Sequence, residues 1–420
     1  MGGAPGAWMG IALSVAKPAA MTSSSAPATG GTVVDRGLEG VVVGATELSN
    51  VEGALGRLTY RGYDIADLAA NATFEEVCYL LLFGQLPNAY QLADLGVRVA
   101  ANRALPEPIL EWLEATPKGA WPMDVLRTTI SALAMFAPHR EHDGAHPSNP
   151  RSAIHLIAKT PTIVAAWDRI RRGLHPIAPL PSLSVAANFL YMRTGKMPIP
   201  EAERALDAYL VLLADHSYNA STFAARVTAS TRADIFAGAT SAVAALEGDL
   251  HGGAPGNVMK MILEIGEPAR ADGYVRALVA RGERIMGMGH REYKVRDPRA
   301  SHLQEMARTL GAAFDPRWYA VARALEDAAN AVLHEAKPGR PIHANVEFYT
   351  APMLYSLGIP PDEFTCLFAC ARMAGWTAHI LEQLGNNRLI RPQSSYAGPP
   401  ATPWLPIGKR GSAGTTGLGE

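Results

Sequence analysis

Apolar residues recur at three- and four-residue spacing through most of the chain, and this period predicts α-helices. Alanine and leucine, both strong helix formers, are prominent in these runs. Prolines and glycines separate one run from the next. The predicted helices span Phe74–Phe83, Val125–Ala137, Ser152–Arg171, Ser182–Thr194, Glu201–Ala214, Ile235–Leu246, Asn257–Ile265 and Phe364–Leu384. No repeat of solenoid length is found.

Strand-like patterns are confined to the region before the first helix. Val41–Val43 and Leu58–Tyr60 are short apolar runs separated by a turn-rich segment, which predicts a minor N-terminal β element. The pattern as a whole therefore predicts an all-α protein with a small β contribution.

The run Phe364–Leu384 is the strongest helix candidate, and between Phe364 and Ile380 its only obligatory charge is Arg372. A buried arginine needs an anion, either a carboxylate from another helix or a ligand, and the pattern leaves both open. Cys366 and Cys370 are four residues apart on this helix, so we expect them to share a buried face as small hydrophobic residues.

Composition narrows the class of protein. With 420 residues and 48% hydrophobic content, the chain can bury a core large enough for one big domain or two coupled ones. A formal net charge of −1 with dispersed basic residues argues against a nucleic-acid binder. The longest uncharged stretch, Gly173–Met192, contains three prolines, so no membrane span is expected. Three cysteines cannot form a disulfide framework, which favours a cytoplasmic location.

The two ends of the chain have the composition of disordered tails. Residues 1–35 are rich in Ala, Gly, Ser and Pro, and Met21 is a second candidate start. Residues 409–420 are expected to form a loose C-terminal tail.

A loop that begins at Met286 carries the clearest ligand-binding pattern. Gly287 and Gly289 can adopt positive φ and bring backbone N–H groups close to a ligand. His290 can donate a hydrogen bond, and Arg299 can bind a carboxylate in bidentate fashion. The cationic character of this loop points to a small anionic ligand.

Three further segments place polar residues where an ordinary helical core would not: Asp215–Thr222, Leu250–Gly256 and Asn345–Thr350. Together with the loop at Met286, and in this order, they resemble the citrate synthase family. The resemblance extends from about Leu38 to about Gly398. By itself, a histidine before Gly-Gly-Ala-Pro could also be a helix-capping residue.

The resemblance implies a large helical domain, made of residues 36–250 and 359–408, with a smaller helical domain of residues 251–358 inserted into it. An active site between the domains would open and close, with Gly252 and Gly287 as candidate joints. The family also implies a homodimer, and we expect this chain to lack the extra N-terminal domain of hexameric, NADH-inhibited members.

The reaction implied by the resemblance joins acetyl-CoA to oxaloacetate and hydrolyses the thioester to give citrate. Glu347 would remove a methyl proton while His251 donates a hydrogen bond to the developing enolate. We expect His251 to be neutral, because the helix N-terminus that follows it disfavours an imidazolium. His290 would polarise the ketone of oxaloacetate.

The remaining expected contacts also come from the resemblance. Residues expected to bind oxaloacetate are His216, Arg299, Arg372 and, from the partner subunit of the dimer, Arg391. Residues expected to bind CoA are Ile285, Gly287, Met288, Gly289 and Lys294, with Arg291 and Lys260 as weaker candidates. No metal is expected, because the three histidines lack ligand spacing, and no cofactor is expected beyond the CoA thioester.

Two positions depart from the family pattern. Most members carry aspartate at the position of Glu347, and the extra methylene moves the carboxylate by roughly 1 Å, which can cost on the order of a hundredfold in rate. Gln393 stands where many members have a second basic residue. The alternatives left open are a 2-methylcitrate synthase that uses propionyl-CoA, a non-catalytic homologue that binds CoA or dicarboxylates, and a citryl-CoA lyase.

Overall fold

The structure is a computed structural model that describes residues 36–38, 40–137, 148–289, 292–293, 295–336 and 342–410. The chain forms two compact units: residues 44–391 make up the main unit, and residues 1–43 with 392–420 make up the other. The predicted disordered segment 1–35, and all of the predicted C-terminal tail except Lys409 and Arg410, lie outside the described residues.

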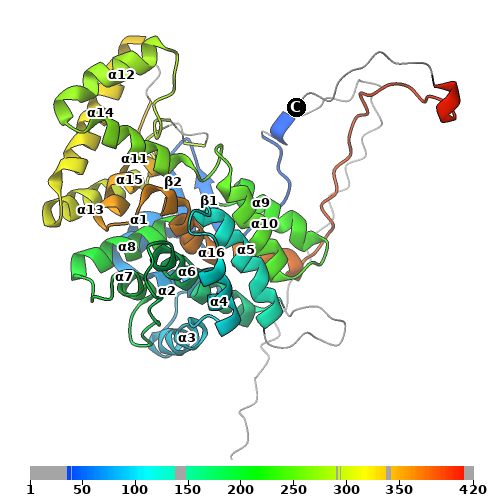
Figure 1. Cartoon of the computed structure of the whole chain (residues 1–420), viewed down its shortest axis with the longest axis horizontal. Coiled ribbons are helices and arrows are strands. Elements are labelled where there is room, and N and C mark those ends of the chain that lie inside the picture. The colour runs from blue at the N-terminus through cyan, green and yellow to red at the C-terminus, as the bar shows by residue number, and fades with distance from the viewer. Residues whose placement is uncertain are drawn as a thin grey trace, which may run out of the picture. The chain divides into compact units, whose positions relative to one another are not determined.

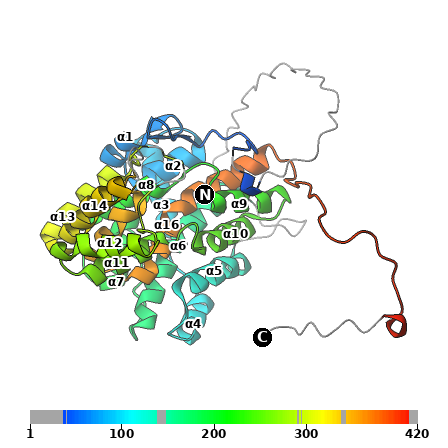
Figure 2. The same cartoon turned by 90° about the horizontal axis from the view of Figure 1, so that it is seen from above.

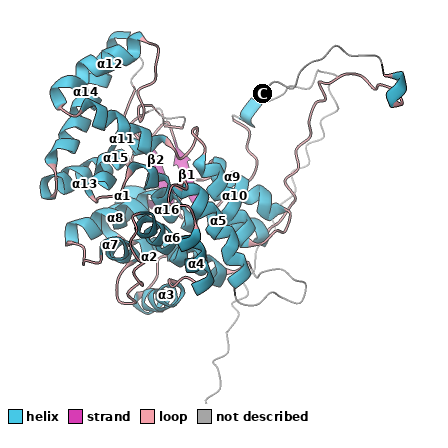
Figure 3. Ribbon diagram, in the orientation of Figure 1, coloured by secondary structure: helices cyan, strands magenta, loops and turns pink. Residues whose placement is uncertain are grey.

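Helices dominate the main unit, as the apolar period predicts (Figure 3). The α-helices are α1 Ile65–Asn71, α2 Phe74–Phe83, α3 Ala89–Asn102, α4 Glu107–Ala115, α5 Pro122–Leu133, α6 Pro150–Arg171, α7 Val185–Thr194, α8 Pro200–Leu213, α9 Ala220–Ser230, α10 Ile235–Glu247, α11 Ala254–Ile265, α12 Ala271–Ala280, α13 Ala300–Ala313, α14 Pro316–Ala336, α15 Val346–Ser356 and α16 Phe364–Gly385. Short 3-10 helices span Arg36–Leu38, Ala134–Phe136, Pro268–Arg270, Pro361–Glu363 and Ile407–Lys409.

Local capping chemistry explains where several helices begin. The predicted helix Phe74–Phe83 is confirmed to the residue, because Thr73 and Glu76 form a capping box at its start and Gly84 ends it in a left-handed conformation. α6 begins two residues earlier than predicted, since the side chain of Asn149 caps it and Pro150 occupies its first position.

The predicted β element is partly confirmed. β1 Ser49–Glu52, β2 Arg57–Tyr60 and β3 Tyr63–Asp64 form an antiparallel sheet in that order, and β2 contains the predicted strand Leu58–Tyr60. The prediction of a strand at Val41–Val43 is wrong. Those valines are exposed, Val42 by 90%, and the edge of β2 is occupied by the nearer segment Ser49–Glu52, with which it forms a hairpin.

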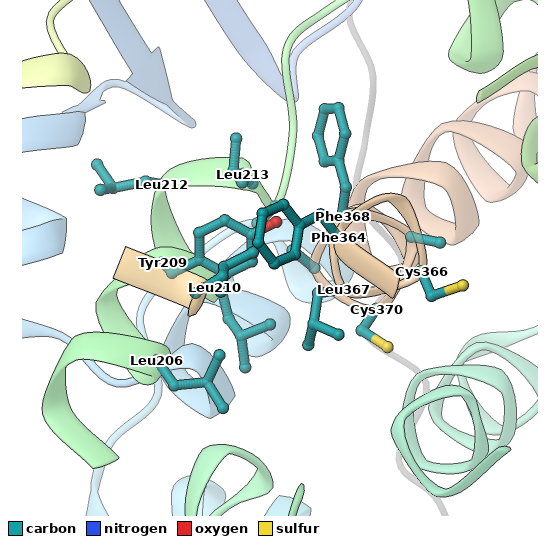
Figure 4. Packing of buried hydrophobic residues seen from close by; sticks show 14 of the residues in the cluster. Leu206, Tyr209, Leu210, Leu212, Leu213, Phe364, Cys366, Leu367, Phe368 and Cys370 are labelled. Carbon is teal, nitrogen blue, oxygen red and sulfur yellow. The ribbon is translucent and has the colours of Figure 1, made fainter. Parts of the chain in front are cut away.

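α16 runs through the middle of the main unit and packs against α2, α5, α6, α8, α9 and α10 (Figures 1 and 2). Phe364 and Phe368 of α16 and Tyr209 of α8 are all buried and belong to one hydrophobic cluster (Figure 4). Cys366 and Cys370 lie on one side of α16 and are both 1% exposed, which confirms the prediction of a shared buried face.

The helices between residues 251 and 358 pack mainly on one another. α13 lies against α15, α12 against α14, and α15 also packs on α11, and Figure 1 shows this group together. The domain boundaries at residues 250/251 and 358/359 stay a prediction. Within the described part of the chain, no helix is long and apolar enough to cross a membrane.

Candidate active site

His251 lies in the turn before α11, and its ring is oriented by the first turn of α9. The backbone N–H of Ser221 donates to Nε2 of His251 at 3.2 Å, and the Ser221 Oγ lies 2.7 Å from the same nitrogen. A backbone N–H can only donate, so Nε2 is an acceptor and the neutral imidazole carries its proton on Nδ1. His251 therefore has one N–H left to donate to a ligand.

The neutrality of His251 has a different cause from the one the sequence suggests. Burial lowers the pKa of His251 to about 4, and the nearby charge of Arg372 adds to this effect. The N–H of Ser221 at the start of α9, which donates to Nε2, also favours the neutral ring. At neutral pH the imidazole is an uncharged hydrogen-bond donor.

Two neighbours hold Ser221 in position. The side chain of Asn219 caps α9 by accepting the N–H of Thr222 at 3.1 Å, which fixes the first turn that contains Ser221. The indole Nε1 of Trp376, on α16, donates to the Ser221 Oγ at 3.0 Å. The orientation of His251 thus depends on both α9 and α16.

Glu347 is the second residue of α15, and its carboxylate is poorly solvated. Asn345 caps this helix by accepting the N–H of Glu347 at 3.1 Å. The Glu347 Oε2 is shielded from solvent and has no hydrogen-bond partner among the described residues. Burial raises the pKa of Glu347 to about 6, although the Glu347 N–H, Arg299 and Arg372 each favour the charged form. This is the environment of a carboxylate that can act as a base near neutral pH.

The glycine loop is joined to the start of α15 by hydrogen bonds. The N–H of Asn345 donates to the Gly287 carbonyl at 2.9 Å, and the Asn345 side chain donates to the Gly289 carbonyl at 3.1 Å. Gly287 and Gly289 have φ of +79° and +86°, as predicted for residues that need the left-handed region. A shift of this loop would therefore move the cap of the helix that carries Glu347.

The other residues predicted to bind CoA, and His290, are only partly described. Ile285 is buried, Met288 packs partly against the core, and Lys260 is exposed on α11. The other predicted positions, His290, Arg291 and Lys294, lie outside the described residues.

Arg372 is a buried cation in α16, at 1% exposure. Its Nε donates to the Leu213 carbonyl at 2.7 Å, and its guanidinium lies 4.8 Å from the centroid of the Phe368 ring. Among the residues that the structure describes, no carboxylate lies within ion-pair distance of it. Burial lowers the pKa of Arg372 to about 10, partly offset by Asp215. Of the two alternatives, the geometry favours an anion supplied by a ligand.

Arg299 is also buried, but one edge of its guanidinium is occupied. Its Nε and Nη2 donate to the two carboxylate oxygens of Asp297 at 2.9 and 2.7 Å. Burial alone would lower the pKa of Arg299, but the charge and hydrogen bonds of Asp297 raise it. The edge that carries Nη1 is what Arg299 can offer to a ligand.

His216 and Arg391 lie in different surroundings. Nε2 of His216 is 3.1 Å from the hydroxyl of Tyr293, a residue close enough to Arg299 for the two groups to interact electrostatically. Arg391 is exposed and is the last residue of the main unit.

Electrostatic interactions indicate that four of the predicted site residues lie near one another: His251, Glu347, Arg299 and Arg372. The charge of Arg372 acts on both His251 and Glu347, and that of Arg299 acts on Glu347. Among the described residues, no group of three His, Cys, Asp or Glu side chains could hold a metal ion.

Comparison with known proteins extends these observations. A family model described as "Citrate synthase, C-terminal domain" matches residues 37–393. The chain is 46% identical over 378 residues to citrate synthase 2 of Bacillus subtilis, covering 89% of this chain and 99% of that one. It is 42% identical over 366 residues to the 2-methylcitrate synthase of Mycobacterium tuberculosis, covering 87% and 91% respectively.

A solved structure has the same fold. It is the citrate synthase of Thermoplasma acidophilum in ternary complex with carboxymethyl coenzyme A and oxaloacetate, with a TM-score of 0.83, 31% identity and coverage of 90% of this chain and 100% of that one. The matches first define a class: this is an acyltransferase with a mostly helical fold and a small N-terminal sheet. The chain belongs to the citrate synthase family.

Three residues that shape the site are not predicted from the sequence. Ser221 lies in a segment singled out for its polar character, and its place two residues after the capping Asn219 was the available signal. Trp376 follows Arg372 by four residues, so helical spacing puts both on one face. Asp297 is two residues before Arg299, but no sequence rule predicts that the two side chains pair.

Proposed function

We propose that the protein condenses acetyl-CoA with oxaloacetate and hydrolyses the resulting citryl-CoA to citrate and free CoA. The observation that carries this proposal is the state of His251, whose Nε2 is committed to Ser221 and whose Nδ1–H is left to donate. A neutral donor of this kind suits an oxygen that gains negative charge in the transition state, because it stabilises that charge without needing a counter-ion of its own.

Glu347 acts as the base in the first step. Its carboxylate takes a proton from the methyl group of acetyl-CoA, and the C–H electron pair forms the carbon–carbon double bond of an enolate. The thioester oxygen takes up the charge and accepts the hydrogen bond from His251. A carboxylate with a pKa of about 6 and an unpaired oxygen is more basic than a solvated glutamate and is still largely ionised at pH 7.

Carbon–carbon bond formation is the second step. The enolate carbon attacks the ketone of oxaloacetate, whose oxygen is protonated with help from His290, and water then cleaves the thioester to release CoA. Arg372 binds one carboxylate of oxaloacetate, since it is a buried cation with no carboxylate partner in the described part of the chain. Arg299 and His216 complete this subsite.

We assign CoA to the glycine loop, that is to Ile285, Gly287, Met288, Gly289 and Lys294. The hydrogen bonds between this loop and Asn345 support the assignment, because they couple the proposed CoA site to the helix that carries Glu347. The protein is proposed to act as a homodimer in which Arg391 reaches the partner's site. We propose the cytoplasm as its location, since all three cysteines are free.

The substrate choice between acetyl-CoA and propionyl-CoA depends on a single methylene, worth about 1–3 kcal/mol. A 2-methylcitrate synthase is the second candidate, because one relative at 42% identity carries that name. A purely binding homologue is less well supported, because it would have no use for an unpaired carboxylate held away from solvent.

The test is release of CoA thiol by the purified protein with oxaloacetate, with acetyl-CoA and propionyl-CoA compared side by side. We expect fast release that depends on oxaloacetate and a higher kcat/KM for acetyl-CoA. A propionyl-CoA preference would make the protein a methylcitrate synthase. No release with either substrate from a folded protein would refute the enzymatic proposal.

A further inference from the structure

Arg372, Trp376 and His379 lie at helical spacing on one face of α16. Arg372 and Trp376 have roles in the proposed site, as substrate ligand and as support for Ser221. His379 is fully buried, at 0% exposure, and has no part in the chemistry proposed so far. A buried imidazole on this face needs an explanation.

The hydrogen bonds of His379 fix its protonation and orientation. Its Nδ1 lies 2.9 Å from the Nη1 of Arg226, and a guanidinium can only donate, so Nδ1 is an acceptor. The neutral ring then carries its proton on Nε2, which lies 3.2 Å and 3.3 Å from the two carboxylate oxygens of Asp215. His379 thus links a buried cation to a buried carboxylate.

Asp215 directly precedes His216, and its carboxylate holds the backbone that follows. Its Oδ2 accepts the hydroxyl of Ser49 at 2.5 Å and the N–H of Ser217 at 3.3 Å. The same N–H also donates to the Ser49 Oγ at 2.8 Å. Ser217 has φ of +51°, a left-handed conformation that is strained for a non-glycine residue. These bonds hold the strained residue next to His216.

Tyr218 and Ala214, two residues after and two residues before His216, also contact the elements around His379. The ring of Tyr218 stacks on Arg226 at 4.6 Å and meets the edge of His379 at 5.8 Å. Before His216, the Gly375 N–H donates to the Ala214 carbonyl at 3.0 Å, so the loop lies directly against α16. The backbone is therefore held on both sides of His216.

We propose that His379 and Asp215 are positioning residues that fix His216 for binding oxaloacetate. The inference rests on the proposed function, because it assumes that His216 contacts this substrate. A merely structural role would predict loss of stability when the chain of hydrogen bonds is broken, with substrate dependence unchanged. A positioning role predicts a specific effect on oxaloacetate.

The test compares three variants of the full-length protein. His379→Leu removes both hydrogen bonds, whereas His379→Gln keeps an acceptor for Arg226 and an amide donor for Asp215. Thr377→Val is the matched control on the same buried helix, because the bonds that the Thr377 hydroxyl makes within the described residues go to carbonyls of α16.

We expect His379→Leu to raise the KM for oxaloacetate by about 10- to 100-fold, the usual effect of a misplacement of about 1 Å. The KM for acetyl-CoA should stay within about twofold, since the bonds of His251 are intact. His379→Gln should recover most of the oxaloacetate affinity, and Thr377→Val should keep a wild-type KM even if it melts earlier.

The proposal is overturned if His379→Leu folds and keeps a wild-type oxaloacetate KM, or if the glutamine variant is as impaired as the leucine variant. Should His379→Leu fail to fold, Asp215→Asn replaces it, because an amide in place of the carboxylate weakens the hydrogen bonds that Asp215 accepts from His379 and Ser49. Calorimetric titration with oxaloacetate alone separates the two proposals. A wild-type protein that neither binds oxaloacetate nor releases thiol would refute the proposed function, whereas failure confined to the variants' behaviour would refute only the positioning role.

Discussion

Replacing Glu347 with glutamine should nearly abolish turnover and at the same time stabilise the folded protein. Glutamine has the same length and shape but cannot accept a methyl proton. The loss of the base should lower kcat by about 10²–10⁴-fold, the usual contribution of general-base catalysis.

The stability gain follows from the pKa. The pKa of Glu347 rises from 4.5 to about 6 because of burial, and this difference corresponds to about 2 kcal/mol of unfavourable free energy for the ionised form. A raised carboxyl pKa means that this penalty is absent below about pH 4.5, develops up to about pH 6 and is complete above it. Removing the charge should therefore stabilise the variant by up to about 2 kcal/mol at pH 7.5, with little gain at pH 4.5.

Two assays check the pair of effects. Thiol release with saturating oxaloacetate gives kcat, and thermal melting at pH 7.5 and at the lowest pH that keeps the protein folded gives the stability difference. Glu347→Asp is the matched control, since it keeps the charge and the base but shortens the side chain. It should retain measurable turnover without the stability gain.

Turnover of Glu347→Gln within about tenfold of wild type would show that the carboxylate is not the base. If Glu347→Gln melts at a lower temperature than wild type at pH 7.5, the ionised Glu347 side chain does not destabilise the folded protein.

Three further predictions follow from the same geometry. Arg372→Leu should raise the KM for oxaloacetate by about 10- to 100-fold, because one or two hydrogen bonds to a charged group are lost. An unchanged KM in the thiol assay would return Arg372 to a structural role. Gly287→Ala should lower the melting temperature more than Gly289→Ala. Both positions have positive φ, but a Cβ at Gly287 would lie 2.8 Å from a Val258 methyl, whereas the nearest atom at Gly289 is 3.8 Å away. Equal melting temperatures of the two variants would contradict this. Below pH 6, kcat/KM for acetyl-CoA should fall about tenfold per pH unit as Glu347 is protonated, and a profile flat to pH 5 would show that its pKa is not raised.

Most of the helical architecture could be predicted because it depends on local signals. The apolar period predicts the full extent of α2, and the capping residues Thr73 and Gly84 mark the same two ends. Local signals could not decide whether Val41–Val43 forms a strand, because three adjacent valines do not indicate which segment pairs with β2. That choice is made by a hairpin between β1 and β2, which is a tertiary outcome.

The sequence predicts the candidate site as a set of residues, but the contacts among them come only from the structure. Motif order pointed to His251 and Glu347, yet the state of His251 depends on Ser221, thirty residues earlier, and on Trp376 of α16. The pairing of Arg299 with Asp297 likewise depends on rotamers that no spacing rule describes. Long-range hydrogen bonds of this kind are decided by packing, which a single sequence does not display.

The most direct test of the account follows the methyl protons of the substrate. Acetyl-CoA with a fully deuterated methyl group is incubated with oxaloacetate and the protein, and the product is analysed by mass spectrometry. We predict citrate that has lost one methyl deuterium, formed at a rate that Glu347→Gln nearly abolishes. Absence of citrate from the wild-type reaction, or its formation at an unchanged rate by the variant, would contradict the claim that Glu347 removes the proton that starts condensation.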